Sequence, residues 1–89
     1  MLLGKVVGTV WATKKDPKLE GVKFQIVQEQ NPDESVTGKY VVAVDSVGAG
    51  ASETVLVAAG SSARQTELTK NKPVDAVIMA IVDKLDVWE

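Results

Sequence analysis

The 89-residue sequence contains neither cysteine nor histidine. The lack of cysteine excludes disulfide bonds, thiolate metal ligands and cysteine nucleophiles. The lack of histidine removes the commonest zinc ligand and the usual general base near neutral pH. Much of enzyme chemistry is therefore excluded by composition, and we expect no catalytic residue, no cofactor and no bound metal.

Aromatic side chains and surplus positive charge are also scarce. Phe24, Tyr40, Trp11 and Trp88 are the whole aromatic supply, and ten basic residues stand against twelve acidic ones. A domain that binds single-stranded nucleic acid needs stacking aromatics and a basic groove, so we expect no nucleic-acid partner. The two tryptophans lie near the two ends of the chain, where they are expected either to pack together or to contribute to an interface.

Long hydrophobic runs are absent. No stretch approaches the roughly 18 uninterrupted apolar residues that a membrane helix needs. The apolar N-terminal stretch 1–12 carries Lys5 inside the run, whereas a secretory signal carries its positive charge before the run. We therefore expect a soluble intracellular protein without a membrane partner.

Valine is abundant, with 16 residues, and Leu, Ile, Val and Phe together supply 26 of the 89 residues. That share is well above the level of roughly 20% below which chains are usually disordered. Turn residues divide the chain into apolar runs without a repeat or linker, so one domain covering residues 1–89 is predicted. The runs are Leu2 to Thr13, Val22 to Gln30, Lys39 to Ser46, Thr54 to Ala58 and Ala76 to Trp88.

These runs favour a mainly β protein, either a small closed barrel or a sandwich. Five strands and one short helix before the last strand are the elements of an OB-like barrel. The last run is ambiguous, because its apolar residues fall at helical spacing while its dense β-branching suits a buried strand equally well.

Two runs carry more detailed signals. Gly4 and Gly8 lie within the first run and predict a bulge or a sharp bend. The second run alternates with a period of two, which indicates a half-buried strand. One of its faces carries Val22, Phe24 and Ile26, and the other carries Lys23 and Gln25.

Gly48-Ala49-Gly50 follows a predicted strand, as the start of a dinucleotide-binding fingerprint does. However, Glu53 stands where the third glycine is required, and a strand follows where the fingerprint needs a helix. We favour a structural role for these glycines, in close backbone packing or in a turn with positive φ.

Gly60-Ser61-Ser62-Ala63-Arg64 places serines at a bend, but the chain has no histidine to activate them. Ser61 or Ser62 is predicted to cap a helical turn that contains Ala63, Arg64 and Gln65. Arg64 is the only arginine, and we expect its planar fork to pair with a carboxylate, in the same chain or across a subunit boundary. The aspartates are scattered, and Asp83 and Asp86 are expected on the solvated surface.

An ordered set of motifs runs along nearly the whole chain. It begins with Gly8-Thr9-Val10 and Thr13, continues with Leu19, Gly21, Lys23 and Val27-Gln28, and closes with Pro73-Val74-Asp75-Ala76 and Ala80-Ile81-Val82-Asp83. Its most specific part is Asp45-Ser46-Val47-Gly48-Ala49-Gly50, Glu53, Val55-Leu56-Val57 and Gly60-Ser61-Ser62-Ala63-Arg64. This set resembles the CcmL/EutN family, the pentameric vertex proteins of bacterial microcompartments. One departure is Ser52, near which many members carry glycine.

The resemblance implies a small five-stranded OB-like closed β-barrel with one short helix, in which the last run is a strand. It also implies assembly into a ring, usually a homopentamer, that closes the corners of a polyhedral shell in the bacterial cytoplasm. Hexameric microcompartment shell proteins would be its partners, and no enzymatic activity is expected. The chain itself leaves open the cargo of the compartment and a five-fold against a six-fold ring.

Two candidate sites follow from this interpretation. Small side chains would let several copies of one loop crowd around the ring axis, with a carboxylate at the rim of a central opening. This candidate central-axis loop consists of Gly48, Ala49, Gly50, Ala51, Ser52 and Glu53. The candidate subunit interface consists of Ser61, Ser62 and Arg64. An OB-like binding module for oligonucleotide or oligosaccharide is the alternative function, and a small enzyme using Ser or Asp is a third.

Overall fold

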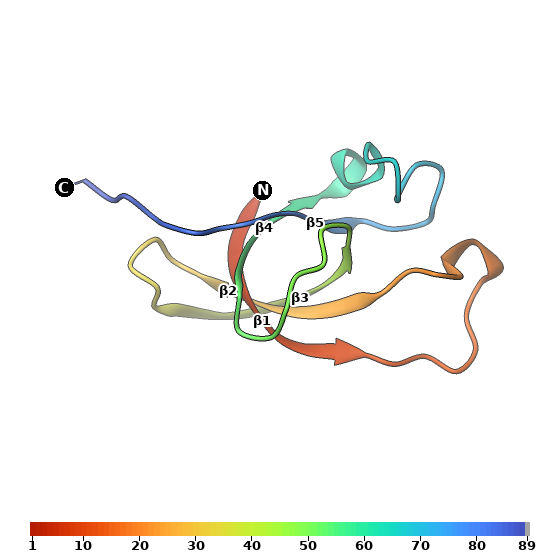
Figure 1. The fold of residues 1–89 in the computed structure, drawn as a ribbon, viewed down its shortest axis with the longest axis horizontal. Helices are drawn as coiled ribbons and strands as arrows, with labels where there is room; N and C mark the ends of the chain where they lie inside the picture. Colours follow the sequence, from red (N-terminus) through yellow and green to blue (C-terminus); the bar gives the residue numbers. More distant parts are fainter. Residues whose placement is uncertain (89) are drawn as a thin grey trace.

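A computed structural model describes residues 1–88, in which five strands close into a barrel (Figure 1). The strands are β1 (Leu2–Val10), β2 (Phe24–Gln30), β3 (Val36–Asp45), β4 (Thr54–Ala59) and β5 (Ala76–Ile81). Their order around the barrel is β1-β2-β3-β5-β4, and every pairing is antiparallel except that of β3 with β5. The closed five-stranded barrel is confirmed, and the sandwich is excluded.

Two short 3-10 helices lie between the strands, η1 (Pro17–Leu19) and η2 (Gly60–Arg64). Only one short helix was expected, and η1 lies between the first two predicted runs. It forms because Pro17 occupies the first helical position and the Asp16 carboxylate accepts the backbone N–H of Lys18. None of the helices in the described part of the chain is long and apolar enough to span a membrane.

The glycines of β1 act as predicted. The β1–β2 register shifts between Val6 and Gly8, which is the expected bulge. At Gly4 the two strands approach so closely that a Cβ atom would lie 2.7 Å from the carbonyl oxygen of Gln28. Only glycine fits this position without displacing backbone.

The core consists of two groups of buried side chains. The first fills the barrel and includes Val6, Val27, Val55, Val57 and Ile78. The second lies beneath η2 and includes Val22, Val44, Ala58, Ala63, Val74 and Val77. Branched side chains of medium size pack a narrow barrel well, so the valine-rich composition suits this interior.

The buried face of β2 differs from what its alternation suggests. Gln25 is only 2% exposed and Val27 is fully buried, whereas Phe24 and Ile26 are half-buried. Val22 is buried, but it precedes the strand. The side of β2 that carries Phe24 and Ile26 is therefore the less buried one, and Phe24 packs against the second core group. The register of the barrel turns Gln25 inward, where it finds hydrogen-bond partners.

The last strand ends earlier than predicted. It stops at Ile81, and residues 82–88 continue as an extended segment that leaves the barrel at one end (Figure 1). Ile81 pairs with Val55, and the backbone N–H of Val82 donates to the carbonyl oxygen of Thr54. Because β4 begins at Thr54, the following residues have no strand beside them.

Candidate functional site

The loop after β3 is held by one carboxylate. Oδ1 of Asp45 accepts the backbone N–H groups of Val47, Gly48 and Ala49 at 3.1, 2.9 and 3.1 Å. Three donors on one ionised acceptor form a strong, charge-assisted turn. Gly48 has φ +75°, a conformation that glycine adopts without a steric penalty.

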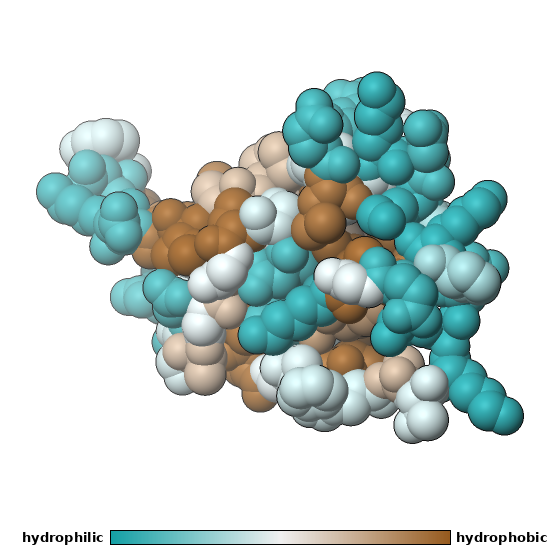
Figure 2. All heavy atoms as spheres, turned by 45° about the vertical axis from the view of Figure 1, so that its right-hand side comes forward, coloured by the Kyte–Doolittle hydropathy of each residue, from teal (hydrophilic) through white to brown (hydrophobic). Residues whose placement is uncertain are grey.

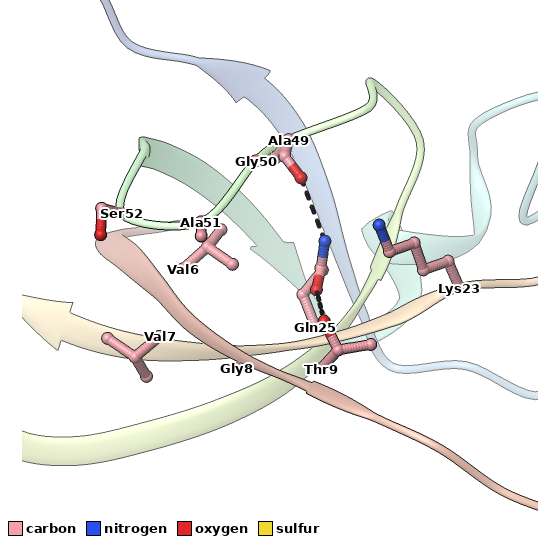
Figure 3. Close-up of a pocket in the computed structure, with 10 residues that line it drawn as sticks. All are labelled: Val6, Val7, Gly8, Thr9, Lys23, Gln25, Ala49, Gly50, Ala51 and Ser52. Carbon is pink, nitrogen blue, oxygen red and sulfur yellow. Dashed lines mark hydrogen bonds between the residues drawn. The ribbon is translucent and has the colours of Figure 1, made fainter.

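A second anchor reaches the loop from inside the barrel. The hydroxyl of Thr9 donates to Oε1 of Gln25 at 2.8 Å, and Nε2 of Gln25 donates to the carbonyl oxygen of Ala49 at 3.0 Å (Figure 3). The same Nε2 lies 3.4 Å from Oδ2 of Asp45. These bonds satisfy a buried amide and tie β1 and β2 to the loop.

The end of the loop is attached to β1. The backbone N–H of Ser52 donates to the carbonyl oxygen of Val6 at 2.8 Å. The backbone N–H of Val6 donates to the carbonyl oxygen of Glu53 at 3.0 Å. The Glu53 carboxylate also accepts the backbone N–H of Gly50. The loop is therefore braced at both ends and closed on itself.

The candidate central-axis residues do not share one environment. Ala49 is 2% exposed and belongs to the barrel core, and Glu53 is half-buried. The exposed members are Gly48, Gly50, Ala51 and Ser52. A hollow of about 470 Å³ lies between Ala49–Ser52 and β1, with Lys23 and Gln25 among its lining residues (Figure 3). The loop thus presents small side chains outward from a rigid base.

Ser52 keeps the geometry expected of a glycine. Its φ is +67°, in the left-handed region, and its backbone is paired with β1. A serine therefore occupies a conformation that glycine adopts more easily.

The dinucleotide-like motif is arranged unlike a nucleotide site. The N–H groups after β3 point at Asp45, and β4 follows the motif where a helix would be required. The glycines have the structural role that we favoured.

The η2 region differs from its prediction. The helix begins at Gly60, so Ser61 and Ser62 lie inside it, and its N-cap is Ala59 without a side-chain hydrogen bond. The Ser62 hydroxyl instead donates back to the carbonyl oxygen of Ala59 at 2.8 Å. Ser61 and Ser62 are exposed, while Ala63 is fully buried.

Within residues 1–88, Arg64 does not pair with a carboxylate. Its Nη1 donates to the backbone carbonyl of Val74 at 3.1 Å, which ties η2 to the segment before β5. Among residues 1–88 the ion pair found is Lys84 with Asp86. Arg64 is an exposed residue, and its guanidinium keeps further donors for another contact.

The Thr9–Gln25–Asp45 network was not predicted from the sequence. In the sequence Asp45 is one of several scattered carboxylates, and Gln25 lies opposite the apolar face of its run. One available signal was an aspartate at the end of a strand before a glycine-containing turn, since such side chains bond to the backbone that follows. Asp83 and Asp86 lie on the exposed surface, as expected.

The two tryptophans do not pack against each other within the chain. Trp11 is 88% exposed and Trp88 is 85% exposed. The first of the two expectations for these residues is therefore wrong for a single copy.

Known proteins share this arrangement. Residues 1–83 match the EutN_CcmL family model, described as ethanolamine utilisation protein EutN/carboxysome. This chain belongs to the EutN/CcmL family. A EutN/CcmL relative, the carboxysome shell vertex protein CcmL of Nostoc sp., is 47% identical over 88 residues, which cover 98% of this chain and 87% of that protein.

Solved EutN/CcmL structures have the same fold. Gloeobacter violaceus CcmL gives a TM-score of 0.94 at 42% identity, covering 98% of this chain and 90% of that one. The GrpN pentameric microcompartment shell protein from Rhodospirillum rubrum gives a TM-score of 0.91 at 41% identity, covering 99% of this chain and all of that one. The resemblance drawn from the ordered motifs is confirmed.

Proposed function

We propose that this chain is a shell vertex protein of a bacterial microcompartment and acts as a homopentamer in the shell, within the cytoplasm. The main support is the structural similarity to the GrpN pentameric shell protein, which extends over 99% of this chain and the whole of GrpN. A sheet of hexagonal tiles is flat, and five-fold units supply the curvature that closes it. Residues 1–89 would form one vertex domain, hexameric shell proteins would surround the ring, and no catalysis is required.

Native mass spectrometry tests this function directly. We expect a mass of five subunits at micromolar concentration, and a five-fold ring in electron micrographs. A monomer at the same concentration would contradict the proposal. No particular feature of the structure favours the alternative of an oligonucleotide-binding or oligosaccharide-binding module.

Within the ring, we place the loop Gly48–Glu53 nearest the five-fold axis. Its outward side chains are small, and Asp45 and Gln25 hold its shape, so five copies can approach closely. Ala51→Trp should then disrupt the pentamer, whereas Lys39→Trp, at an exposed position of β3, should not. An unchanged pentamer with Ala51→Trp, or a crystal structure with this loop at the outer rim, would contradict the placement.

We assign Ser61, Ser62 and Arg64 to the contact between neighbouring subunits. These side chains are exposed, and the fork of Arg64 can pair with a carboxylate of the next copy while it keeps its bond to Val74. Arg64→Lys retains the charge but loses the planar fork of the guanidinium. We therefore expect its pentamer to dissociate at a higher protein concentration than the wild-type pentamer. Ring assembly that is unchanged by Arg64→Ala in native mass spectrometry would end this assignment.

A further inference from the structure

The segment 82–88, which we call the tail, leaves the barrel after β5. Its first residue still bonds to β4 through the Val82 N–H and the Thr54 carbonyl, and Val82 and Leu85 are half-buried. Farther along, the side chains of Val87 and Trp88 are exposed. Exposure of a large apolar side chain to water is unfavourable, and its burial in a contact with another surface is correspondingly favourable.

A groove of about 390 Å³ lies at the opposite end of the molecule, between the end of β1 and the approach to β2. We call it the 9–24 groove. Its apolar lining includes Val10, Trp11, Val22 and Phe24, and its exposed lysines are Lys15 and Lys23. Figure 2 brings this end forward and shows apolar side chains among hydrophilic ones.

The tail and the groove cannot meet within one copy. The molecule measures 46 Å along its longest axis, which is horizontal in Figure 1. The tail leaves the barrel at the left of that view, and the loop after β1 lies at the right. A head-to-tail contact between copies joins two unlike surfaces of the chain, and it closes into a ring when successive copies are rotated by a fixed fraction of a turn.

We propose that the tail of each copy docks into the 9–24 groove of the next copy, so that Trp88 packs against Trp11 across the subunit boundary. This inference rests on the proposed ring and names the surfaces that close it. Each tryptophan can bury 150–250 Å², so the pair supplies roughly 300–500 Å² of the approximately 1,600 Å² that a stable interface buries.

Charge favours a second copy of the chain as the occupant. The segment 12–24 carries Lys14, Lys15, Lys18 and Lys23 against Asp16 and Glu20. The tail carries Asp83 and Asp86 against Lys84, which is already paired with Asp86 at 3.3 Å. Opposite net charge on the two surfaces steers the tail toward the groove and sets its direction.

Cross-linking tests this docking, and the natural lack of cysteine makes it specific. The full-length variants Trp11→Cys and Trp88→Cys are mixed, allowed to exchange subunits, and treated with a short bis-maleimide. We expect a covalent dimer only in the mixture. The variant with both substitutions should give a ladder up to five chains. Tyr40→Cys mixed with Trp88→Cys is the control, because Tyr40 is an exposed aromatic on β3, and it should give no dimer.

Native mass spectrometry before cross-linking separates the possible failures. If the wild-type chain forms no pentamer, the proposed function fails. If the pentamer forms without the 11–88 cross-link, the docking fails while the function stands. Dimers from Trp88→Cys alone would mean tail-to-tail contact between rings, and dimers with Tyr40→Cys would mean docking elsewhere; both contradict the proposal.

A second pair of positions protects the test against a loss of assembly caused by removing a tryptophan. Lys15→Cys and Asp86→Cys leave both tryptophans in place and lie in the groove and the tail. They should cross-link in the same pattern. Tryptophan fluorescence, excited at the red edge where tyrosine does not absorb, gives an independent measurement. In Trp11→Phe the only tryptophan is Trp88, and its emission should shift to the blue on assembly. An unshifted, water-exposed spectrum in the pentamer would overturn the docking.

Discussion

The side-chain amide of Gln25 donates a hydrogen bond to the carbonyl oxygen of Ala49 across 3.0 Å. This contact joins a residue of β2 to a loop 24 positions later, and the Thr9 hydroxyl completes it by donating to the other end of the amide. The loop that we place at the ring axis is therefore held in part by a polar group inside the barrel, in addition to the bonds that Asp45 and Glu53 accept from its backbone.

Replacement of Gln25 by Met should lower the free energy of unfolding by about 1–3 kcal/mol, because the variant leaves the buried Ala49 carbonyl without its donor. Urea unfolding at a fixed protein concentration measures the change. Gln28→Met is the matched control, since the Gln28 amide bonds the Tyr40 hydroxyl on the surface; we expect a change within about 0.5 kcal/mol there. Equal effects of the two variants would show that the Gln25 network does not hold the fold.

Substitutions of Asp45 should form a graded series. Asp45→Ala removes the acceptor of three backbone N–H groups and should lower the free energy of unfolding by about 3 kcal/mol or more. Asp45→Asn keeps one acceptor oxygen without the charge and should cost about half as much, because hydrogen bonds to charged groups are roughly twice as strong as neutral ones. Asp75→Asn, at an exposed position, serves as the control. An Asp45→Ala variant with the same free energy of unfolding as the wild type would contradict this role of Asp45.

The two glycines of β1 should respond differently to alanine. A Cβ atom at Gly4 would lie 2.7 Å from the backbone oxygen of Gln28, so two strands must separate. We expect Gly4→Ala to destabilise the barrel by about 1–3 kcal/mol. At Gly8 the nearest atom is Cδ1 of Ile26 at 3.2 Å, the movable end of a side chain. Gly8→Ala should therefore be much milder, and thermal unfolding of both variants distinguishes the sites. A larger loss at Gly8 would contradict the described β1–β2 approach.

Positive φ angles in the loop predict opposite effects at two positions. Gly48→Ala, at φ +75°, should destabilise the protein by about 1 kcal/mol. Ser52→Gly, at φ +67°, should stabilise it by about 0.5 kcal/mol, since relief of the left-handed strain exceeds the added flexibility of the unfolded chain. Chemical unfolding of the two single variants checks the signs. If Ser52→Gly is destabilising, the serine side chain contributes to the loop in a way that its backbone angle does not reveal.

The strand pattern was predictable because its signals are local. Valine-rich runs separated by turn residues placed the first four strands, the family resemblance made the ambiguous last run a strand, and Gly8 marked the bulge where the register of β1 shifts. Strand ends were less predictable. The third run was predicted to begin at Lys39, after Gly38, yet β3 begins at Val36, which pairs with Gln30 at the end of β2. Val36 and Thr37 suit a strand, and pairing with β2 carries the strand through Gly38.

The candidate sites were predictable only in part. The loop 48–53 and the η2 segment were selected by their motifs, and both lie where the chain turns out of the barrel. Their internal contacts could not be predicted, because the partners of Asp45, Gln25 and Arg64 are set by distances that folding creates. The Arg64 side chain donates to the backbone carbonyl of Val74, ten positions away. The expected serine cap does not form, because η2 begins at Gly60 and has Ala59 as its N-cap.

By itself, the sequence determined the family, the number of strands and the exclusion of cysteine and histidine chemistry, since these depend on residue identity, order and local periodicity. The tertiary structure alone decided which side of β2 faces inward, why Asp45 is buried, and where β5 ends. The physical reason is the same in each case. Closure of the barrel sets the register between strands, and the register determines which groups are removed from water and which partners they meet.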